Sequence, residues 1–200
     1  MPMRDIRPAA FDEFVHWYLA REWRKRGEPP LSRDAHGSAL SIMRRIHPGK
    51  LRQWFDAAEW RLVEFTAIEE ILRLVCVDSM IMRRNLLVRD EPATDRRLLG
   101  NVIANARSFH YFDNAAVAQS DPMEYAWRQS RIDQYRRAWP RFGGEERIAA
   151  CSLNMEERVE NGAANYYLHD GFGRMLAFAY LVWFEGRPFV PVEALLALER

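Results

Sequence analysis

The spacing of apolar residues predicts helices in the first quarter of the chain. Across residues 11–23 apolar side chains recur every three or four positions, which is typical of an amphipathic helix, and a turn at 27–30 ends it. A second helical run follows Ser38 and stops at 47–49. Residues 50–58 predict a short third helix, because their large apolar side chains fall on one side of it.

Residues 60–65 predict the first strand, because the sequence WRLVEF is apolar and aromatic with partial alternation. Thr66 and Glu69 then have the spacing of a capping box, in which each side chain bonds a backbone N–H at the helix start. We therefore expect a helix after Thr66 that extends toward Met82. It would bury one apolar stripe, made of Ile68, Ile71, Leu72, Val75 and Cys76.

Cap and turn signals divide the middle of the chain. Thr94 is expected to cap a helix that includes Ile103, and the aromatic residues 107–112 predict a strand or an ordered loop. Asp121, followed by a proline, predicts another helix that ends before Pro140. Aspartate caps a helix start, and proline is tolerated in the first turn.

Strand and helix signals alternate toward the end of the chain. Residues 147–153 are β-compatible, and Asn161 with Gly162 is a strong turn signal. A short apolar run that begins at Tyr166 predicts a strand, and a long apolar run follows it after an Asp-Gly pair. This order indicates a strand, a turn and a helix.

These elements predict an α+β fold in a single domain, 1–200. A mainly helical portion, about 1–140, is expected to pack on a small mixed-sheet core, about 145–200, with a further strand at 60–65. The length of 200 residues and the hydrophobic content of 48% are sufficient for one well-buried core.

Charge gives no overall preference for a partner. The formal net charge is +1, so no global field favours nucleic acid or a membrane surface. Basic clusters at 21–26, 44–45 and 83–84 are interpreted as solvated helix faces, since acidic residues lie close by. No apolar run reaches the roughly 20 residues of a membrane span, and the N-terminus has no apolar signal core. We expect a cytoplasmic protein without a membrane partner.

Cysteine and histidine spacing favours no metal site. Cys76 and Cys151 are far apart and lie in apolar runs, so we predict two buried, reduced thiols. The five histidines lack the pairing with each other or with cysteine that a structural zinc site requires.

Candidate chemistry is concentrated at residues 169–174, where the predicted strand meets the predicted helix. Asp170 and Gly171 form the turn, and Arg174 falls in the first turn of the helix. Backbone N–H groups at a helix start are unpaired and carry partial positive charge. Glycine lets an anion approach that backbone closely, and a guanidinium nearby adds charge. The pattern predicts a phosphate-binding cradle.

The segment 166–195 resembles the core of the ParB/sulfiredoxin superfamily. Members have a strand, an Asp-Gly-x-His-Arg motif or a near variant, a helix with small residues, a glycine loop and a closing Val-Pro-Val strand. Here residues 170–174 read Asp-Gly-Phe-Gly-Arg, Gly186 marks the loop, and residues 190–192 read Val-Pro-Val. The resemblance covers about thirty residues.

The resemblance implies a nucleotide or another phosphorylated ligand, with ATP and Mg as candidate cofactors. Arg174 would pair with the phosphate, Gly171, Phe172 and Gly173 would supply close backbone, and Asp170 would cap the helix or contact ribose or metal. The activity implied is phosphoryl transfer, or cleavage of phosphodiester bonds as in a nuclease.

One departure from the motif affects the expected chemistry. Gly173 stands where the superfamily has a histidine, which removes a donor and an acid/base group. His169 lies on the other side of Asp170 and, in a strand, need not point the same way. Phosphate binding is therefore predicted more directly than catalysis.

Other residues are candidates for supporting roles. His110, close to Asp113, would suit a general base, and Glu157 would suit a base or a magnesium ligand. Arg187, just after Gly186, would add a second phosphate contact. Each also has an ordinary structural interpretation: a packed histidine, a solvated acidic face and a free loop arginine.

Three alternatives to the phosphate cradle stay open. The Asp-Gly pair is also an ordinary turn before a helix, with Arg174 solvated. A non-enzymatic protein of phage or mobile-element type would keep the fold and use its helical N-terminal portion to bind a protein partner. DNA binding through the arginine clusters is the weakest, because no recognition-helix motif is present.

Overall fold

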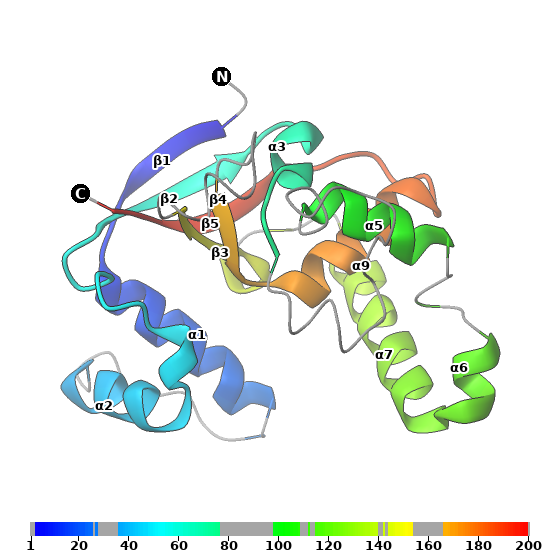
Figure 1. The fold of residues 1–200 in the computed structure, drawn as a ribbon, viewed down its shortest axis with the longest axis horizontal. Coiled ribbons are helices and arrows are strands. Elements are labelled where there is room, and N and C mark those ends of the chain that lie inside the picture. The colour runs from blue at the N-terminus through cyan, green and yellow to red at the C-terminus, as the bar shows by residue number, and fades with distance from the viewer. Residues whose placement is uncertain are drawn as a thin grey trace.

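A five-stranded mixed sheet forms the centre of the fold, in the order β1-β2-β5-β3-β4 (Figure 1). The strands are β1 (Met3–Ala9), β2 (Glu59–Phe65), β3 (Ile148–Ser152), β4 (Tyr166–Asp170) and β5 (Val192–Leu198). Only β3 and β5 pair in parallel, and the other neighbours are antiparallel. The α+β class predicted from the sequence is confirmed.

The computed structural model describes residues 3–25, 27, 36–76, 98–108, 112, 115–139, 142, 144–153 and 166–199. Its longer helices are α1 (Phe11–Lys25), α2 (His36–Ile46), α5 (Leu99–Ser108), α7 (Pro122–Ala138) and α9 (Phe172–Trp183). Its shorter helical segments are η2 (Pro48–Lys50), α3 (Ile68–Leu72), α6 (Ala115–Ser120) and η3 (Gly144–Glu146).

The central strands are covered on both faces, and the alternation of their side chains separates two cores. On β2, Trp60 and Leu62 face the core shared with α1 and α2, whereas Val63 and Phe65 face the core shared with α5, α7 and α9. β3 and β5 alternate in the same way. A strand covered on both faces needs apolar residues at successive positions, which explains the nearly continuous apolar runs of β3 and β5.

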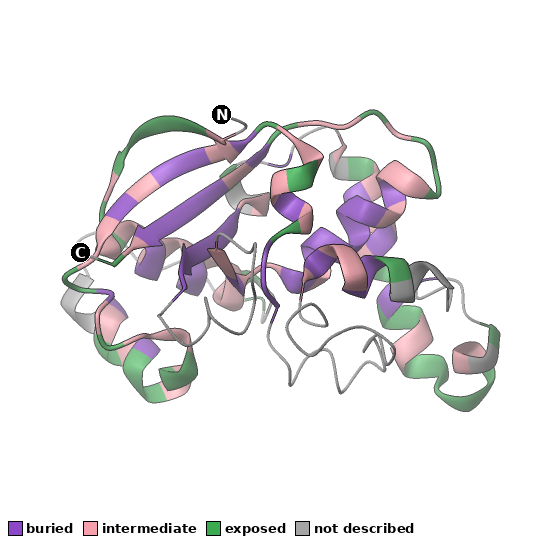
Figure 2. Ribbon diagram, turned by 45° about the horizontal axis from the view of Figure 1, so that its top comes forward, coloured by how far each residue is buried: buried purple, intermediate pink, exposed green. Residues whose placement is uncertain are grey.

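Figure 2 shows the central strands buried, whereas the edge strand β1 is largely exposed. β1 was not predicted from the sequence, since an exposed edge strand carries almost no apolar pattern. Pro8 fits at such an edge, where a missing N–H costs no hydrogen bond within the sheet. Because β1 and β2 join the C-terminal strands, the sheet draws on both ends of the chain.

Several predicted elements are confirmed. The structure has helices over residues 11–25 and 36–46, and strands over 59–65, 148–152 and 166–170. Asp121 caps α7 as predicted, since its carboxylate accepts a hydrogen bond of 3.0 Å from the backbone N–H of Glu124. Pro122 occupies the first helical position.

One predicted helix is absent, and another is shorter than predicted and lacks the expected cap. The helix expected over 50–58 is absent: a short 3-10 turn ends at Lys50, and turns fill the segment up to β2. Thr66 is not a helix cap, because α3 begins after Ala67 and has no side-chain cap. α3 also ends at Leu72, and Val75 instead forms β-bridges to Leu98 and Tyr167. In each case tertiary packing outweighs a short local pattern.

Some expectations fall elsewhere or lie outside the description. Of the Val-Pro-Val residues only Val192 belongs to the closing strand, because β5 begins there. Thr94 and the turn at 161–162 lie outside the described residues. Both cysteines are buried free thiols, as predicted. Among the described helices, none is long and apolar enough to span a bilayer.

Candidate anion-binding site

The strand, turn and helix predicted around Asp170 are all present. β4 ends at Asp170, Gly171 precedes the helix with φ of 112°, and α9 begins at Phe172. Residues other than glycine rarely adopt that backbone conformation. A Cβ at Gly171 would also lie 2.6 Å from Cγ2 of Ile148 and 2.9 Å from Nη2 of Arg174. The turn therefore requires glycine on two grounds.

The Asp170 carboxylate is held by three cations from three elements. It accepts hydrogen bonds of 2.7 Å from Arg21 of α1 and 2.7 Å from Arg174 of α9. Lys50 of η2 donates a third bond of 3.2 Å. Asp170 does not cap α9, because the N-cap residue is Gly171 and no side chain caps that helix start. The carboxylate instead joins both helical layers at the end of β4.

Arg174 is buried rather than solvated, with 3% of its surface exposed. Its guanidinium donates to the carboxylate of Asp170 and to the backbone carbonyl of Arg147. It also lies over the ring of Trp17, 5.3 Å from the ring centre. The guanidinium of Arg21 lies over the same ring at 4.9 Å. Each arginine therefore gains a cation–π contact.

The cluster of Asp170, Arg21, Lys50 and Arg174 carries more positive than negative charge. Three cations surround one carboxylate, so two positive charges are uncompensated within the cluster. Burial alone would raise the pKa of Asp170, but the charges of its three partners outweigh burial and hold this pKa well below its ordinary value. The carboxylate is therefore ionised at neutral pH, and the excess positive charge of the cluster remains.

Buried donors without partners adjoin this cluster. The Nε atoms of Arg174 and Arg147 and the Nε1 atom of Trp17 are buried and make no hydrogen bond. Buried polar groups are usually paired, and an unpaired one costs about 1–3 kcal/mol. Unpaired N–H groups beside excess positive charge are the arrangement that an anion would satisfy.

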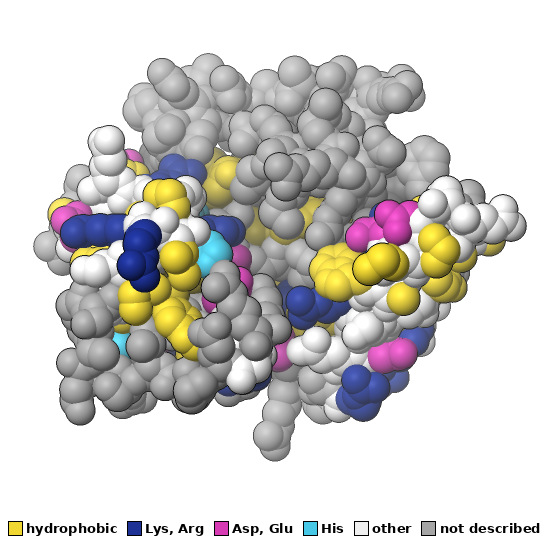
Figure 3. All heavy atoms as spheres, turned by 90° about the horizontal axis from the view of Figure 1, so that it is seen from below, with side chains coloured by type: hydrophobic (Ala, Val, Ile, Leu, Met, Phe, Trp, Pro, Cys, Tyr) yellow, Lys and Arg dark blue, Asp and Glu magenta, His cyan; other side chains and the backbone are white. Residues whose placement is uncertain are grey.

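A cleft of about 470 Å³ opens next to the cluster, between α1 and α7. Arg21 belongs to both the cluster and the cleft wall, and Tyr135 and Glu146 of the wall act electrostatically on Arg174. The described lining residues are Arg21, Arg24, Trp127, Ser130, Arg131, Gln134, Tyr135 and Glu146. Figure 3 shows the face on which α1 and α7 lie, where basic side chains neighbour hydrophobic ones. Three arginines against one glutamate make the cleft basic.

Two aromatic side chains add to the cleft wall. Trp127 is 38% exposed, and Arg131 lies over its ring at 5.5 Å. Tyr135 is buried, and burial raises its pKa to about 12. Its hydroxyl therefore stays protonated at neutral pH and can donate a hydrogen bond. The cleft combines basic groups, a neutral donor and an exposed aromatic ring.

The resemblance implies a backbone role for Phe172 and Gly173, and their side-chain environments leave that role a prediction. The side chain of Phe172 is buried in the core and does not reach a ligand site. Gly173 has open space where a Cβ would be, so a side chain there is sterically allowed. The two glycines of the motif are thus unequal: only Gly171 is required by geometry.

His169 is a packed core residue. Its ring contacts Phe14 and Phe55, and its Nε2 donates to the backbone carbonyl of Lys50 at 2.8 Å. Burial lowers the pKa of His169 to about 4. A neutral imidazole that faces the α1 core does not serve as a base for a ligand in the cleft, so the predicted catalytic role is not supported here.

Arg187 does not belong to this site. It follows the C-terminal end of α9, whereas Arg174 is in the first turn of this 12-residue helix. Arg187 pairs with Glu185 at 3.6 Å. Arg187 is not among the described residues that line the cleft, and the second phosphate contact expected of it stays a prediction. His110 and Glu157 lie outside the described residues.

The residues around Asp170 do not fit a magnesium ion. Its carboxylate is already engaged by three cations, and a fourth cation would be repelled. Among the described residues, no group of three or more His, Cys, Asp or Glu side chains is arranged to hold a metal. The basic groups do fit a phosphate.

Most of the residues that build this site were not predicted from the sequence. Arg21 and Arg24 belong to a cluster interpreted as solvated, and Lys50 was placed in a helix that is absent. The spacing of an aromatic residue four positions before an arginine, as in Trp127 and Arg131, was a usable signal of a shared helix face. Neither a scan against protein-family models nor searches of curated proteins and solved structures find a match for this chain, so the geometry of these residues carries the functional interpretation.

Proposed function

We propose that the protein binds a phosphorylated ligand of the nucleotide class in the cleft between α1 and α7. The observation that carries this proposal is the excess of positive charge around Asp170, from one buried and two partly buried cations, next to buried N–H donors without partners. A phosphate supplies both negative charge and several acceptor oxygens. The resemblance of residues 166–195 to the ParB/sulfiredoxin superfamily favours the same ligand class.

The cleft also accounts for a nucleotide better than for a bare phosphate. A volume of about 470 Å³ lies within the range of small-molecule pockets, and it far exceeds what a single phosphate group fills. Arg21, Arg24 and Arg131 would face the phosphate, and the exposed ring of Trp127 would stack on a base. Stacking of a base on an aromatic side chain is worth about 1–3 kcal/mol.

The proposal concerns binding. Asp170 is unsuited to accept a proton, because its three cationic partners lower its pKa. His169 is buried on the other side of the sheet end. Phosphoryl transfer or phosphodiester cleavage would therefore need a base other than these two residues.

Calorimetric titration in a phosphate-free, low-salt buffer tests the proposal. The ligands are inorganic phosphate, ribose 5-phosphate and adenosine monophosphate, each with and without magnesium. We expect saturable binding of all three, tightest for the nucleotide and independent of magnesium. Arg131→Gln should weaken all three by about tenfold or more, since a hydrogen bond to a charged group contributes about 1.5–3 kcal/mol.

Arg137→Gln is the matched control, because Arg137 is an exposed arginine of the same helix that does not line the cleft. Trp127→Ala should weaken binding of the nucleotide and leave the affinity for ribose 5-phosphate unchanged. Absence of binding by every phosphate ligand, or equal losses in the Arg131 and Arg137 variants, would refute the proposal. Arg174 is a poor test site, since its removal would leave a buried cavity and disturb the fold.

A further inference from the structure

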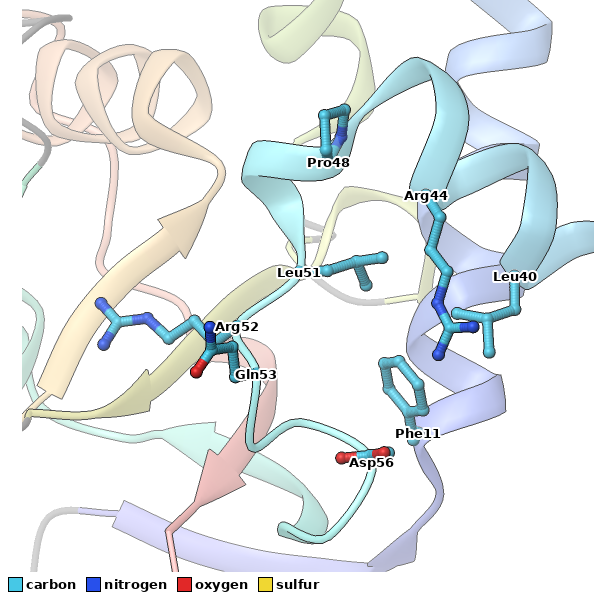
Figure 4. A pocket seen from close by; sticks show the side chains of 8 residues that line it. All are labelled: Phe11, Leu40, Arg44, Pro48, Leu51, Arg52, Gln53 and Asp56. Atoms are coloured by element: carbon cyan, nitrogen blue, oxygen red, sulfur yellow. The ribbon is translucent and has the colours of Figure 1, made fainter.

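A second cavity, of about 240 Å³, lies on the α1 and α2 side of the sheet. It shares no described lining residue with the cleft. The described residues around it are Phe11, Leu40, Arg44, Pro48, Leu51, Arg52, Gln53 and Asp56 (Figure 4). The cavity is therefore a separate candidate site.

Its floor is apolar and fixed by aromatic packing. Phe11 stacks on Trp60 with ring centres 5.9 Å apart and meets the edge of Phe55 at 6.4 Å. Leu40 and Leu51 pack against the same core. Because these groups are held by the core beneath them, the floor exists before a ligand arrives, which lowers the cost of binding.

Two opposite charges flank this floor. Arg44 extends from α2 toward Phe11, and Asp56 lies in the turn before β2 (Figure 4). Both are exposed, and neither makes an ion pair with any residue that the structure describes. Arg52, in contrast, extends toward β4, where its guanidinium lies 4.7 Å from the ring centre of Tyr167. One cation and one anion are thus available to a ligand.

We infer that this cavity binds a free α-amino acid with an apolar side chain. The carboxylate would pair with Arg44, the ammonium with Asp56, and the side chain would cover Phe11, Leu40 and Leu51. The volume of 240 Å³ is below the roughly 300–1,000 Å³ of pockets for larger ligands, and it suits a molecule of amino-acid size. A ligand with both charges and an apolar body matches the apolar floor and the two charges that flank it.

Titration with L-leucine, followed by NMR on the full chain, tests this inference. The comparison ligands are N-acetyl-L-leucine, which lacks the ammonium, L-leucinamide, which lacks the carboxylate, and glycine, which lacks the apolar side chain. We expect saturable binding of leucine with shifts at the cavity residues, and about tenfold or weaker binding of each comparison ligand.

Charge-removing variants separate the two contacts. Arg44→Gln should weaken leucine binding and remove the discrimination against leucinamide. Asp56→Asn should weaken leucine binding and remove the discrimination against N-acetyl-leucine. Arg45→Gln is the matched control, an adjacent exposed arginine that does not line the cavity. It should bind leucine normally, as should Arg131→Gln in the cleft.

Three results would overturn the inference. The first is the absence of saturable leucine binding to the wild-type chain. The second is binding of N-acetyl-leucine as tight as that of leucine, which would indicate the acidic end of a peptide instead. The third is an equal loss in the Arg44 and Arg45 variants. None of these outcomes bears on phosphate binding in the cleft, so the two proposals fail separately.

Discussion

Replacement of Asp170 with asparagine removes the single anion from a cluster of three cations. The substitution keeps the shape of the side chain and leaves Arg174, whose side chain is 2% exposed, without its carboxylate partner. Arg21 and Lys50 lose the same partner, at 2.7 Å and 3.2 Å. Removal of one member of a buried ion pair typically costs about 3–5 kcal/mol of stability. We expect a loss of this size, which is a large fraction of the about 5–15 kcal/mol that stabilises a folded protein.

Because cations are in excess, loss of one cation should destabilise the fold less than loss of the carboxylate. Arg21→Gln leaves Asp170 with two cationic partners, so the carboxylate remains compensated. The variant loses a hydrogen bond and the contact with Trp17, and it also relieves repulsion within the cluster. We expect a loss of about 1–2 kcal/mol, well below that of Asp170→Asn.

Urea denaturation at low ionic strength and neutral pH measures both losses by linear extrapolation. Urea is used because guanidinium salts would screen the charges. Added sodium phosphate should stabilise Asp170→Asn more than the wild-type chain, since the anion can take the place of the lost carboxylate. A bound ligand at 100 times its Kd adds about 2.7 kcal/mol. Equal stability of Asp170→Asn and the wild-type chain, or equal losses of stability in the two variants, would refute the claim that the cluster around Asp170 carries excess positive charge.

The remaining predictions concern the turn, the buried histidine and the α7 cap. Gly171→Ala should cost more than about 1–2 kcal/mol in urea denaturation, since its φ is positive and a Cβ would contact Ile148, whereas Gly173→Ala should cost nothing. The pKa of His169 is lowered to about 4, so the unfolded chain takes up its proton first as pH falls from about 6.5 to about 4. Across that window the unfolding free energy of the wild-type chain should fall by about 3 kcal/mol more than that of His169→Gln, and parallel profiles of unfolding free energy against pH would contradict this. Asp121→Ala should lower the unfolding free energy by about 1 kcal/mol, and an unchanged midpoint would argue against the cap.

Secondary structure could be predicted from the sequence where local signals and tertiary packing favour the same element. The strand, turn and helix at 166–183 were predicted because an apolar run, a glycine and a second apolar run occur in order, and the structure has each of them. Asp121 was predicted as a cap for the same reason. The prediction failed at 50–58, where Trp54 and Phe55 pack into an aromatic cluster from a turn instead of a helix.

The site itself was only half predictable. Asp170 and Arg174 were identified from positions four residues apart, but the other partners of Asp170, Arg21 and Lys50, lie 149 and 120 residues away from it in sequence. No spacing rule connects such distant residues. The basic run at 21–26 contained the missing signal, which could be interpreted only once α1 was known to lie beside the end of β4.

The central claim is that the arginines of the cleft bind phosphate, and NMR of arginine Nε–H groups tests it most directly. On titration with adenosine monophosphate at constant ionic strength, the Nε–H signals of Arg21, Arg24 and Arg131 should shift together and saturate with one Kd. The signal of Arg137, on the same helix as Arg131 but outside the cleft, should not change. Shifts that never saturate, or that are as large for Arg137 as for Arg131, would contradict the claim.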